Sequence, residues 1–541
     1  MTKSHYLKDK LLNQDKLFTN REKEKIWEKY CGFLDLSVEE FMTIQQLLLK
    51  EQLELMSHSG LGQKLMGGQN IQTVENFRRS VPITNYTDYE PYFEIQDDDA
   101  LAKKPAIWAH TSGRMGLVKW APYTTEMLAR LADNTLAAFI LSSALCKGDM
   151  RLQEGTRVVL NLPPLPYTTG IMGYAAAQRI DYKAIPSLKE AAEMNFEERI
   201  RQGYKTALQT GVDYAASIAV VLNKVGETFS NLGKSGQKIP TYHPAALLRM
   251  LKAVILSKLH NRPLMPRDIW KVKGLVCGGT DTVIYREQIH NYWGVQPLDV
   301  YVATEACFIA MQAWNKKGMT FIPFSNFYEF IPENELEKHR HDPAYQPQTI
   351  LMDEVKPGEE YELVITNLLG GAFLRYRVGD VIKITALEDE ETGVKLPQMV
   401  FQRRADDIID ISGFVRFDEK LIWRAIHDTG IPYVDWTARK ETIDGVPSLR
   451  IFIELSGNSV SPEQVRQKID ANLTSLFSDY YDTKQMIGTN PLAVTLLKHG
   501  SFQNYQVNKQ KAGFDLAHLK PPHMNPSDIV LNDLLNSNSS N

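Results

Sequence analysis

The sequence predicts an α/β protein with a large N-terminal domain, in which β-sheets are flanked by helices, and a smaller α+β domain at the C-terminus. Its 541 residues exceed the ~250 to 300 at which a single core usually divides. From about residue 155, short β-rich runs alternate with helical stretches, which indicates α/β layers around a largely buried sheet. After about residue 405 the pattern changes, so we place the domains at 1–404 and 405–541.

The N-terminal region is predicted to be helical. Residues 37–40 spell SVEE, a capping box, and the apolar residues Phe41, Ile44, Leu48 and Leu55 follow at helical spacing. The apolar run TLAAFILSSAL (135–145) is shorter than the ~18 to 20 residues that cross a bilayer, so it is predicted to be a buried helix.

Five β-rich runs predict the strands of the large domain. They are RVVLNL (157–162), KVKGLVCGG (271–279), PLDVYV (297–302), YELVITN (361–367) and DVIKIT (380–385). In the C-terminal domain a strand, SLRIFIEL (448–455), precedes a helix that Ser461 caps, with Pro462 at its first position and Gln464 completing the box. Residues at the end of the chain, NSNSSN, are polar and expected to fray.

Composition favours a small-molecule partner. Lysine and arginine total 61 against 65 acidic residues, a net charge near -4, so no global field attracts nucleic acid or an anionic membrane. We therefore expect no nucleic-acid or membrane partner, and a monomer or weak homo-oligomer. The four cysteines lie far apart and the N-terminus has no apolar secretion signal, which favours a cytoplasmic location.

One short segment resembles the end of a Walker phosphate-binding loop but lacks the required spacing. The letters LGKS (232–235) would need a glycine at position 228, where Thr228 stands, so this segment is predicted to be a polar loop.

A second stretch, HTSGRMGLVKW (110–120), has two readings. Backbone amides around its hydroxyl and glycine residues suit phosphate oxygens, and its lysine adds a mobile cation; the alternative is an ordinary surface turn.

Two further segments also have alternatives. In LDVYVATEA (298–306) a strand runs into a turn where Glu305 is placed to hold Mg²⁺ on a nucleotide; the alternative is a helix N-cap at Thr304. In YELVITNLLGGAFLRYRVGD (361–380) Asp380 is placed to accept hydrogen bonds from ribose hydroxyls. The alternative is a hairpin with Gly379-Asp380 in its turn, and Arg375 and Arg377 as surface or ion-pair residues.

The order and spacing of these segments are more specific than any one of them. The series, ending in FQRRADDIIDISGFVRFDE (401–419), resembles the adenylate-forming superfamily. In particular, FRRSVPITNYTDYEPYF (77–93), VKWAPYT (118–124), NFYEFIP (326–332) and CGGTDTVIYREQIHNYWGVQPLDVYVATEA (277–306) are similar to the Gretchen Hagen acyl-acid amido synthetases, the auxin-responsive promoter family. The resemblance runs from about residue 77 to about 524.

The resemblance implies an ATP-dependent acyl-acid amido synthetase. A carboxylic acid reacts with ATP to give an acyl-adenylate and pyrophosphate, and an amine, usually an amino acid, then displaces AMP to give an amide. An acyl-CoA or acyl-carrier ligase using the same first step is the alternative, and a non-catalytic nucleotide- or acid-binding protein is a third hypothesis.

The resemblance also implies the site residues. Glu305 would hold the Mg²⁺, Asp380 would bind the ribose, and Lys520 would swing in for adenylation, with Lys509 and Lys511 competing for that role. The ATP-binding set comprises Thr111, Ser112, Gly113, Gly116, Lys119, Gly278, Gly279, Tyr301, Thr304, Asp380 and Arg404. Rotation of the small domain would pivot at residues 405–407.

The phosphate loop departs from the family pattern at Arg114 and Met115, where further hydroxyl residues are usual. Arg114 either replaces the lost hydrogen bonds with a charged fork on the β- or γ-phosphate, as a catalytic residue, or its bulk excludes the normal triphosphate pose. Residues 163–174 (PPLPYTTGIMGY) form either a wall of the acyl-acid pocket or a structural loop.

Overall fold

A computed structural model describes residues 16–111, 119–235, 243–279, 282–342, 344–405, 408–411, 415–457, 460–511 and 521–536. Contacts within the chain divide it into two compact units, with the break between Arg403 and Arg404. No helix among the described residues is long and apolar enough to cross a membrane.

The first unit opens with helices that cover its core. They are α2 (Lys16–Asn20), α3 (Lys23–Cys31), α4 (Val38–Ser57), α5 (Gly60–Leu65), α6 (Val74–Ser80) and α7 (Glu90–Phe93), with single turns of 3₁₀ helix at Gly32–Asp35, Tyr86–Asp88 and Asp98–Ala100. The predicted capping box is confirmed, because the Ser37 side chain accepts a hydrogen bond from the Glu40 amide and the Glu40 carboxylate accepts one from Ser37. Phe41 is buried, but Ile44, Leu48 and Leu55 are only half-buried.

Among the described residues, eleven strands form one sheet in the order β10-β11-β12-β13-β9-β8-β7-β6-β5-β3-β4. In chain order they are β3 (Thr156–Asn161), β4 (Tyr182–Ile185), β5 (Tyr214–Ile218), β6 (Gly274–Gly278), β7 (Pro297–Ala303), β8 (Cys307–Gln312), β9 (Met319–Phe321), β10 (Asn326–Pro332), β11 (Glu360–Asn367), β12 (Tyr376–Ala386) and β13 (Gln398–Arg404). Strands β3 to β7 pair in parallel, whereas β7 pairs antiparallel with β8. All five predicted strands of this domain are present.

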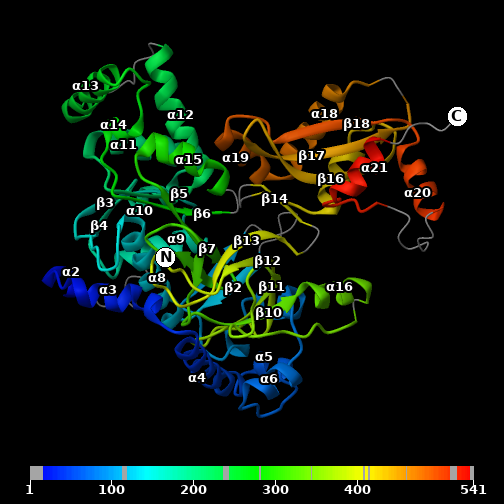
Figure 1. The fold of residues 1–541 in the computed structure, drawn as a ribbon, viewed down its shortest axis with the longest axis horizontal. Helices are drawn as coiled ribbons and strands as arrows, with labels where there is room; N and C mark the ends of the chain where they lie inside the picture. The colour runs from blue at the N-terminus through cyan, green and yellow to red at the C-terminus, as the bar shows by residue number, and fades with distance from the viewer. Residues whose placement is uncertain are drawn as a thin grey trace. The chain divides into compact units, whose positions relative to one another are not determined.

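The remaining helices of the first unit connect and flank this sheet. They are α8 (Thr125–Ser143), α9 (Thr168–Ala177), α10 (Leu188–Glu193), α11 (Phe196–Thr210), α12 (Ala219–Ser235), α13 (Pro244–Leu259), α14 (Pro266–Ile269), α15 (Thr282–Trp293) and α16 (Glu333–His341). Helices α11, α12 and α15 pack against β3, β5 and β7, and α8 packs against β6, β7 and β8 (Figure 1). The predicted buried helix is confirmed in α8. The predicted polar loop at 232–235 is wrong, since these residues end α12.

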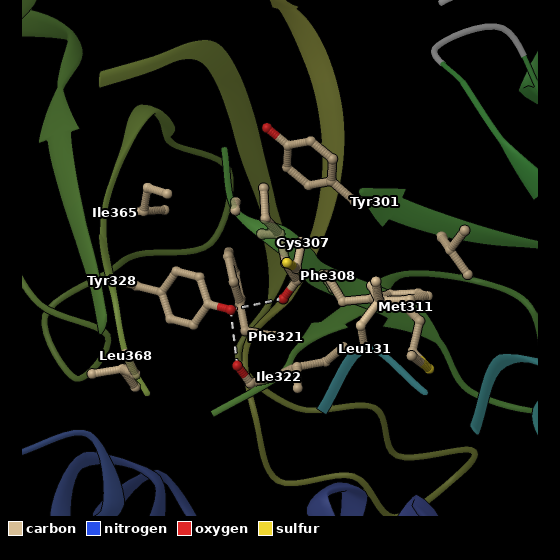
Figure 2. Close-up of a cluster of buried hydrophobic side chains, with 14 of the residues drawn as sticks. Leu131, Tyr301, Cys307, Phe308, Met311, Phe321, Ile322, Tyr328, Ile365 and Leu368 are labelled. Atoms are coloured by element: carbon tan, nitrogen blue, oxygen red, sulfur yellow. Dashed lines mark hydrogen bonds between the residues drawn. The ribbon is translucent and has the colours of Figure 1, made fainter. Parts of the chain in front are cut away.

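The core of the first unit lies between α8 and strands β8 to β11. Phe308, Met311, Phe321 and Leu131 fill it, and the Tyr328 hydroxyl reaches into it (Figure 2). That hydroxyl lies 2.8 Å from the Ile322 carbonyl oxygen and 3.1 Å from that of Ile309, so this buried polar atom is satisfied by backbone.

A separate two-stranded sheet joins β1 (Ile107–Thr111) and β2 (Lys119–Tyr123) in antiparallel register. Its last pair is Thr111 opposite Lys119.

The second unit is an α+β structure with its own core. It contains a hairpin of β14 (Ile409–Ile411) and β15 (Val415–Phe417), a sheet of β16 (Tyr433–Ile443), β17 (Val446–Leu455) and β18 (Leu492–Leu497), and helices α17 (Glu419–His427), α18 (Pro462–Leu476), α19 (Ser478–Ile487), α20 (Ser501–Lys511) and α21 (Asp528–Leu535). The predicted strand at 448–455 and the capping box of Ser461 and Gln464 are both confirmed.

Candidate active site

The turn after β7 carries the first two candidate residues. Residues 304–306 form a turn that leads directly into the antiparallel strand β8, so the alternative of a helix N-cap at Thr304 is wrong. Thr304 and Glu305 therefore lie at the carboxyl end of a strand that is parallel to β6. Ligands of α/β sheets bind at this edge.

Asp380 lies inside β12 and is only 6% exposed. The alternative of a turn at Gly379-Asp380 is wrong, although Gly379 has a positive φ of 77° that favours glycine. The Tyr301 hydroxyl donates a hydrogen bond to Asp380 Oδ2 at 2.5 Å, and the Phe401 ring packs edge-on against the Tyr301 ring. Two motifs 79 residues apart are thereby joined through side chains.

A second link joins the same two strands. Tyr376, the first residue of β12, donates from its hydroxyl to Glu305 Oε1 at 3.2 Å, and the Asn367 side chain donates to the Glu305 carbonyl at 2.9 Å. In a flat sheet, β7 and β12 would lie about 19 Å apart, because three strands separate them at ~4.8 Å spacing. The hydrogen bonds from Tyr301 to Asp380 and from Tyr376 to Glu305 therefore require this part of the sheet to curl.

Glu305 has the chemistry of a Mg²⁺ ligand. It forms no ion pair with any residue of the described ranges. Its Oε1 accepts the hydrogen bond from Tyr376, and Oε2 is the second oxygen of the same carboxylate. No group of three or more metal-ligating side chains is found in the part of the chain that the structure describes. Magnesium is usually held by one or two carboxylates together with substrate phosphates and water, so a single half-buried carboxylate fits this ion.

Thr304 is tied to α9. Its carbonyl accepts a hydrogen bond from the Tyr123 hydroxyl at 2.7 Å, and its Oγ1 accepts one from Thr168 at 3.0 Å. Thr168 follows Tyr167, whose backbone forms a bridge with His110 of β1. Residues 168–177 form a helix, so the interpretation of 163–174 as only a loop is wrong.

Lys119, the first residue of β2, lies beside the same group. Its ammonium stands 4.7 Å from the centre of the Tyr86 ring, and the Tyr86 hydroxyl accepts a hydrogen bond from the Trp120 amide at 2.6 Å. Burial raises the pKa of Tyr86 well above its ordinary value, and the negative charge of Glu305 adds to that rise. Lys119 thus lies over the ring of a neutral tyrosine.

The remaining candidates fall into three groups. Gly278 ends β6 opposite Val300 of β7, and Gly279, exposed at φ 113°, follows it. Arg404 is the last residue of β13. Ser112, Gly113, Arg114, Gly116 and Lys520 lie outside the described residues, and the side chains of Thr111, Lys509 and Lys511 do so as well.

Arg375 and Arg377 are ion-pair residues. The Arg375 guanidinium makes a bidentate contact with Glu329, at 3.0 and 2.8 Å, and both side chains are almost fully buried. Arg377 makes a similar pair with Glu362, at 2.8 and 2.6 Å. These pairs hold β12 to β10 and β11, so they support the strand that carries Asp380.

Sequence reasoning missed the residues that support the site: Tyr86, Tyr123, Thr168, Asn367 and Tyr376. All five lie in the stretches 77–93, 118–124, 163–174 and 361–380 already singled out, but no local pattern states which side chain meets which atom. Only sequence position could have marked two of them as site residues, since Tyr376 and Asn367 lie in the segment that leads to Asp380.

The fold has counterparts among solved structures. The structure is similar to that of 2-hydroxyisobutyryl-CoA ligase, with a TM-score of 0.54 and 15% identity over 85% of this chain and 87% of that one. It is also similar to the acyl acid amido synthetase AtGH3.15, with a TM-score of 0.51 and 17% identity over 93% of this chain and 95% of that one. The fold class expected from the sequence is confirmed.

Sequence comparisons give the family. The model of the GH3 family N-terminal domain matches residues 32–179, and that of the GH3 family central domain matches residues 319–404. The jasmonoyl-L-amino acid synthetase JAR4 of Nicotiana attenuata is 27% identical over 86% of this chain and 88% of its own length. The indole-3-acetic acid-amido synthetase GH3.10 of Arabidopsis thaliana is 20% identical over 94% and 96%. These matches are to domains and members of the GH3 family, which is the family that the motifs of the chain resemble.

Proposed function

We propose that this protein is an ATP-dependent acyl-acid amido synthetase. Adenylation joins a carboxylate oxygen of the acid to the α-phosphorus of ATP, and pyrophosphate leaves with the electrons of the broken bond. An amine then attacks the acyl carbon, loses a proton and displaces AMP, which gives the amide. A free carboxylate is a poor acyl donor because its oxide is a poor leaving group. In the acyl-adenylate the leaving group is AMP, which leaves readily.

The observation that carries this proposal is the pair of side-chain links between β7 and β12. The hydrogen bonds from Tyr301 to Asp380 and from Tyr376 to Glu305 link the two motifs, which supports Asp380 as the carboxylate for the ribose hydroxyls and Glu305 as the carboxylate for Mg²⁺. Asp380, held by Tyr301, accepts from the ribose hydroxyls in this proposal. Mg²⁺, when bound to Glu305 and the phosphates, offsets the negative charge that grows on the pyrophosphate leaving group.

The cations of the proposed site also offset the negative charge that grows on the pyrophosphate leaving group. Lys119 supplies a mobile ammonium, and the 112–118 segment supplies backbone amides together with Arg114. Thr304, fixed by Thr168 and Tyr123, contacts the α-phosphate. Gly278 and Gly279 form part of the adenine wall, Arg404 lies at the domain boundary, and Lys520 approaches from the second unit for adenylation.

The substrate class follows from the relatives. Both near-full-length relatives are named for joining a small organic acid to an amine or amino acid. We therefore propose a small carboxylic acid and an amino acid as substrates of this chain, and a cytoplasmic monomer or weak oligomer as the working form. Transfer to CoA uses the same first step, and the likeness to a CoA ligase concerns the fold alone.

The test separates the two half-reactions. Pyrophosphate release is measured with ATP, Mg²⁺ and a panel of carboxylic acids, and mass spectrometry then compares products formed with amino acids and with CoA. We expect release with at least one acid and an amide product. Release followed by a thioester alone would favour the CoA ligase, and binding of ATP without release for any acid would favour the non-catalytic protein.

Two substitutions test the site. Glu305→Ala and Asp380→Ala should each abolish pyrophosphate release, because each removes a carboxylate that binds ATP or its metal, while circular dichroism shows the fold intact. Undiminished release in either variant would refute the assignment of that residue.

A further inference from the structure

Helix α13 presents its large apolar side chains to solvent. Only Ala246 and Ala253 of this helix are buried, and they face the helices α11 and α14 that α13 contacts. The large side chains are between 38% and 75% exposed: Leu247, Leu248, Leu251, Val254, Ile255 and Leu259. A helix that covers a core shows the opposite pattern, with large residues inward.

The exposed residues form one stripe. At 100° per residue they fall within an arc of about 140°, and the two buried alanines lie on the opposite side of the helix. Figure 1 shows α13 next to α14, away from the large sheet of its unit. Contiguous apolar surface of this kind marks an interaction site.

The charged residues of the segment that carries this stripe are all positive. From 243 to 267 the sequence contains Arg249, Lys252, Lys258, Arg262 and Arg267, and no aspartate or glutamate. This local excess contrasts with the net charge of -4 of the whole chain.

Two of these cations, Lys252 and Lys258, can face a partner, whereas two others have structural roles. Arg249 donates to the carbonyls of Leu208 and Gln209 at the end of α11, and Arg262 pairs with Asp268, so both have structural roles. Lys252 and Lys258 are exposed; Lys252 flanks the apolar stripe and Lys258 lies within it near its C-terminal end. Long lysine stems suit an interface where the ammonium reaches polar headgroups.

We propose that α13 is an interfacial helix that binds an anionic lipid bilayer. The helix axis lies in the membrane plane, the six apolar side chains enter the boundary between headgroups and acyl chains, and the lysines meet lipid phosphates and carboxylates. Its inner face stays on the protein, so the bound state needs no unfolding. Sixteen residues with this charge pattern do not cross the bilayer.

A second copy of the chain suits this face less well. Association of two α13 helices would bring Lys252 and Lys258 of each copy together, and residues 243–267 offer no acidic side chain to neutralise them. An anionic bilayer supplies that complementary charge.

The test uses the full chain and sedimentation with vesicles. We expect binding to phosphatidylcholine vesicles that contain phosphatidylserine to be about tenfold tighter than to phosphatidylcholine alone, and to weaken with salt. The double variant Leu251→Gln, Ile255→Gln should lose at least about tenfold in binding, since both side chains are exposed and leave the buried face of α13 unchanged. Lys252→Gln, Lys258→Gln should abolish the preference for phosphatidylserine.

The matched control is Val283→Gln, which removes an equally exposed apolar side chain from α15. Its vesicle binding should equal that of the unsubstituted protein. The proposal is overturned if the unsubstituted protein binds neither vesicle at low salt, or if the control loses as much binding as the double variant. It is also overturned if sedimentation equilibrium shows a dimer that the double variant dissociates, because α13 would then be a self-association face. Pyrophosphate release without vesicles reports on the proposed function separately.

Discussion

At the scale of single residues, tyrosine hydroxyls organise the candidate site. Tyr301, Tyr376 and Tyr123 each donate to an atom of a candidate residue or its backbone, so the carboxylates are oriented before ATP arrives. Burial and neighbouring charge raise the pKa of Tyr123 far above its ordinary value, which keeps this hydroxyl a donor at every working pH. Such orientation lowers the cost of ordering the site on binding.

The Tyr301 contact gives a prediction. Tyr301→Phe removes the hydrogen bond but keeps the ring, so Asp380 loses the donor that orients it. A hydrogen bond to a charged group contributes about 1.5 to 3 kcal/mol, so we expect the KM for ATP to rise about tenfold or more. Steady-state kinetics of pyrophosphate release measure it.

Tyr328→Phe is the control for that substitution. It removes an equally buried hydroxyl that bonds only backbone carbonyls in the core (Figure 2). It should reduce stability and leave the KM for ATP unchanged. An unchanged KM in Tyr301→Phe would show that this hydroxyl does not position the nucleotide carboxylate.

At the scale of elements, one histidine attaches the segment after residue 520 to the small domain. The His523 ring lies between Glu419 at the start of α17, 2.5 Å from Nδ1, and Asp435 of β16, 2.8 Å from Nε2, and it stacks on Trp436. The backbone of this segment also pairs with β16, because the Ala438 amide donates to the His523 carbonyl. Hydrogen bonding to Asp435, then to Glu419, raises the pKa of His523 above 6.5 against the opposing effect of burial.

This contact predicts a pH dependence of stability. A raised folded-state pKa means that the stabilisation is fully present below the unfolded value of 6.5 and is lost as pH rises through the higher folded value. We therefore expect the difference in unfolding midpoint between the unsubstituted protein and His523→Gln to shrink from about pH 6 to about pH 9. Thermal unfolding at both pH values measures it. His499→Gln, a largely exposed site, is the control; a constant difference for His523→Gln would contradict the imidazolium contact.

At the scale of the whole molecule, the break between Arg403 and Arg404 separates two units with separate cores. Rotation of the second unit about residues 405–407 between the half-reactions is our prediction. One chain carrying out adenylation and then amide formation must admit the amine after pyrophosphate has left, and domain rotation provides this change.

Ala405→Pro tests the pivot. Proline fixes its own φ near -65° and restricts Arg404 before it, so the chain cannot change direction there freely. We expect ATP binding to stay within about threefold and complete amide turnover to fall at least about tenfold. Calorimetry and product formation measure the two. Glu390→Pro, in an exposed turn of the first unit, should change neither. Full turnover in Ala405→Pro would exclude a pivot at this residue.

Secondary structure was predictable where the pattern of neighbouring residues determines it. Helix α8, the strand β7 with its turn, and the capping boxes at Ser37 and Ser461 follow from apolar periodicity and side-chain chemistry within a few residues. The 232–235 segment failed because its glycine and polar residues continue α12 in the context of the packed helix. The outward face of α13 was not predictable, since periodicity shows that a stripe exists and not which side the protein covers.

The sequence by itself determined the fold class, six of the strands, the capped helices, and the motifs that mark the resemblance to the family. The tertiary structure alone decided that Tyr301 meets Asp380 and Tyr376 meets Glu305, across separations of 79 and 71 residues. The physical reason is that backbone propensity and patterning act over a few neighbours, whereas these contacts depend on how far a sheet of many strands curls.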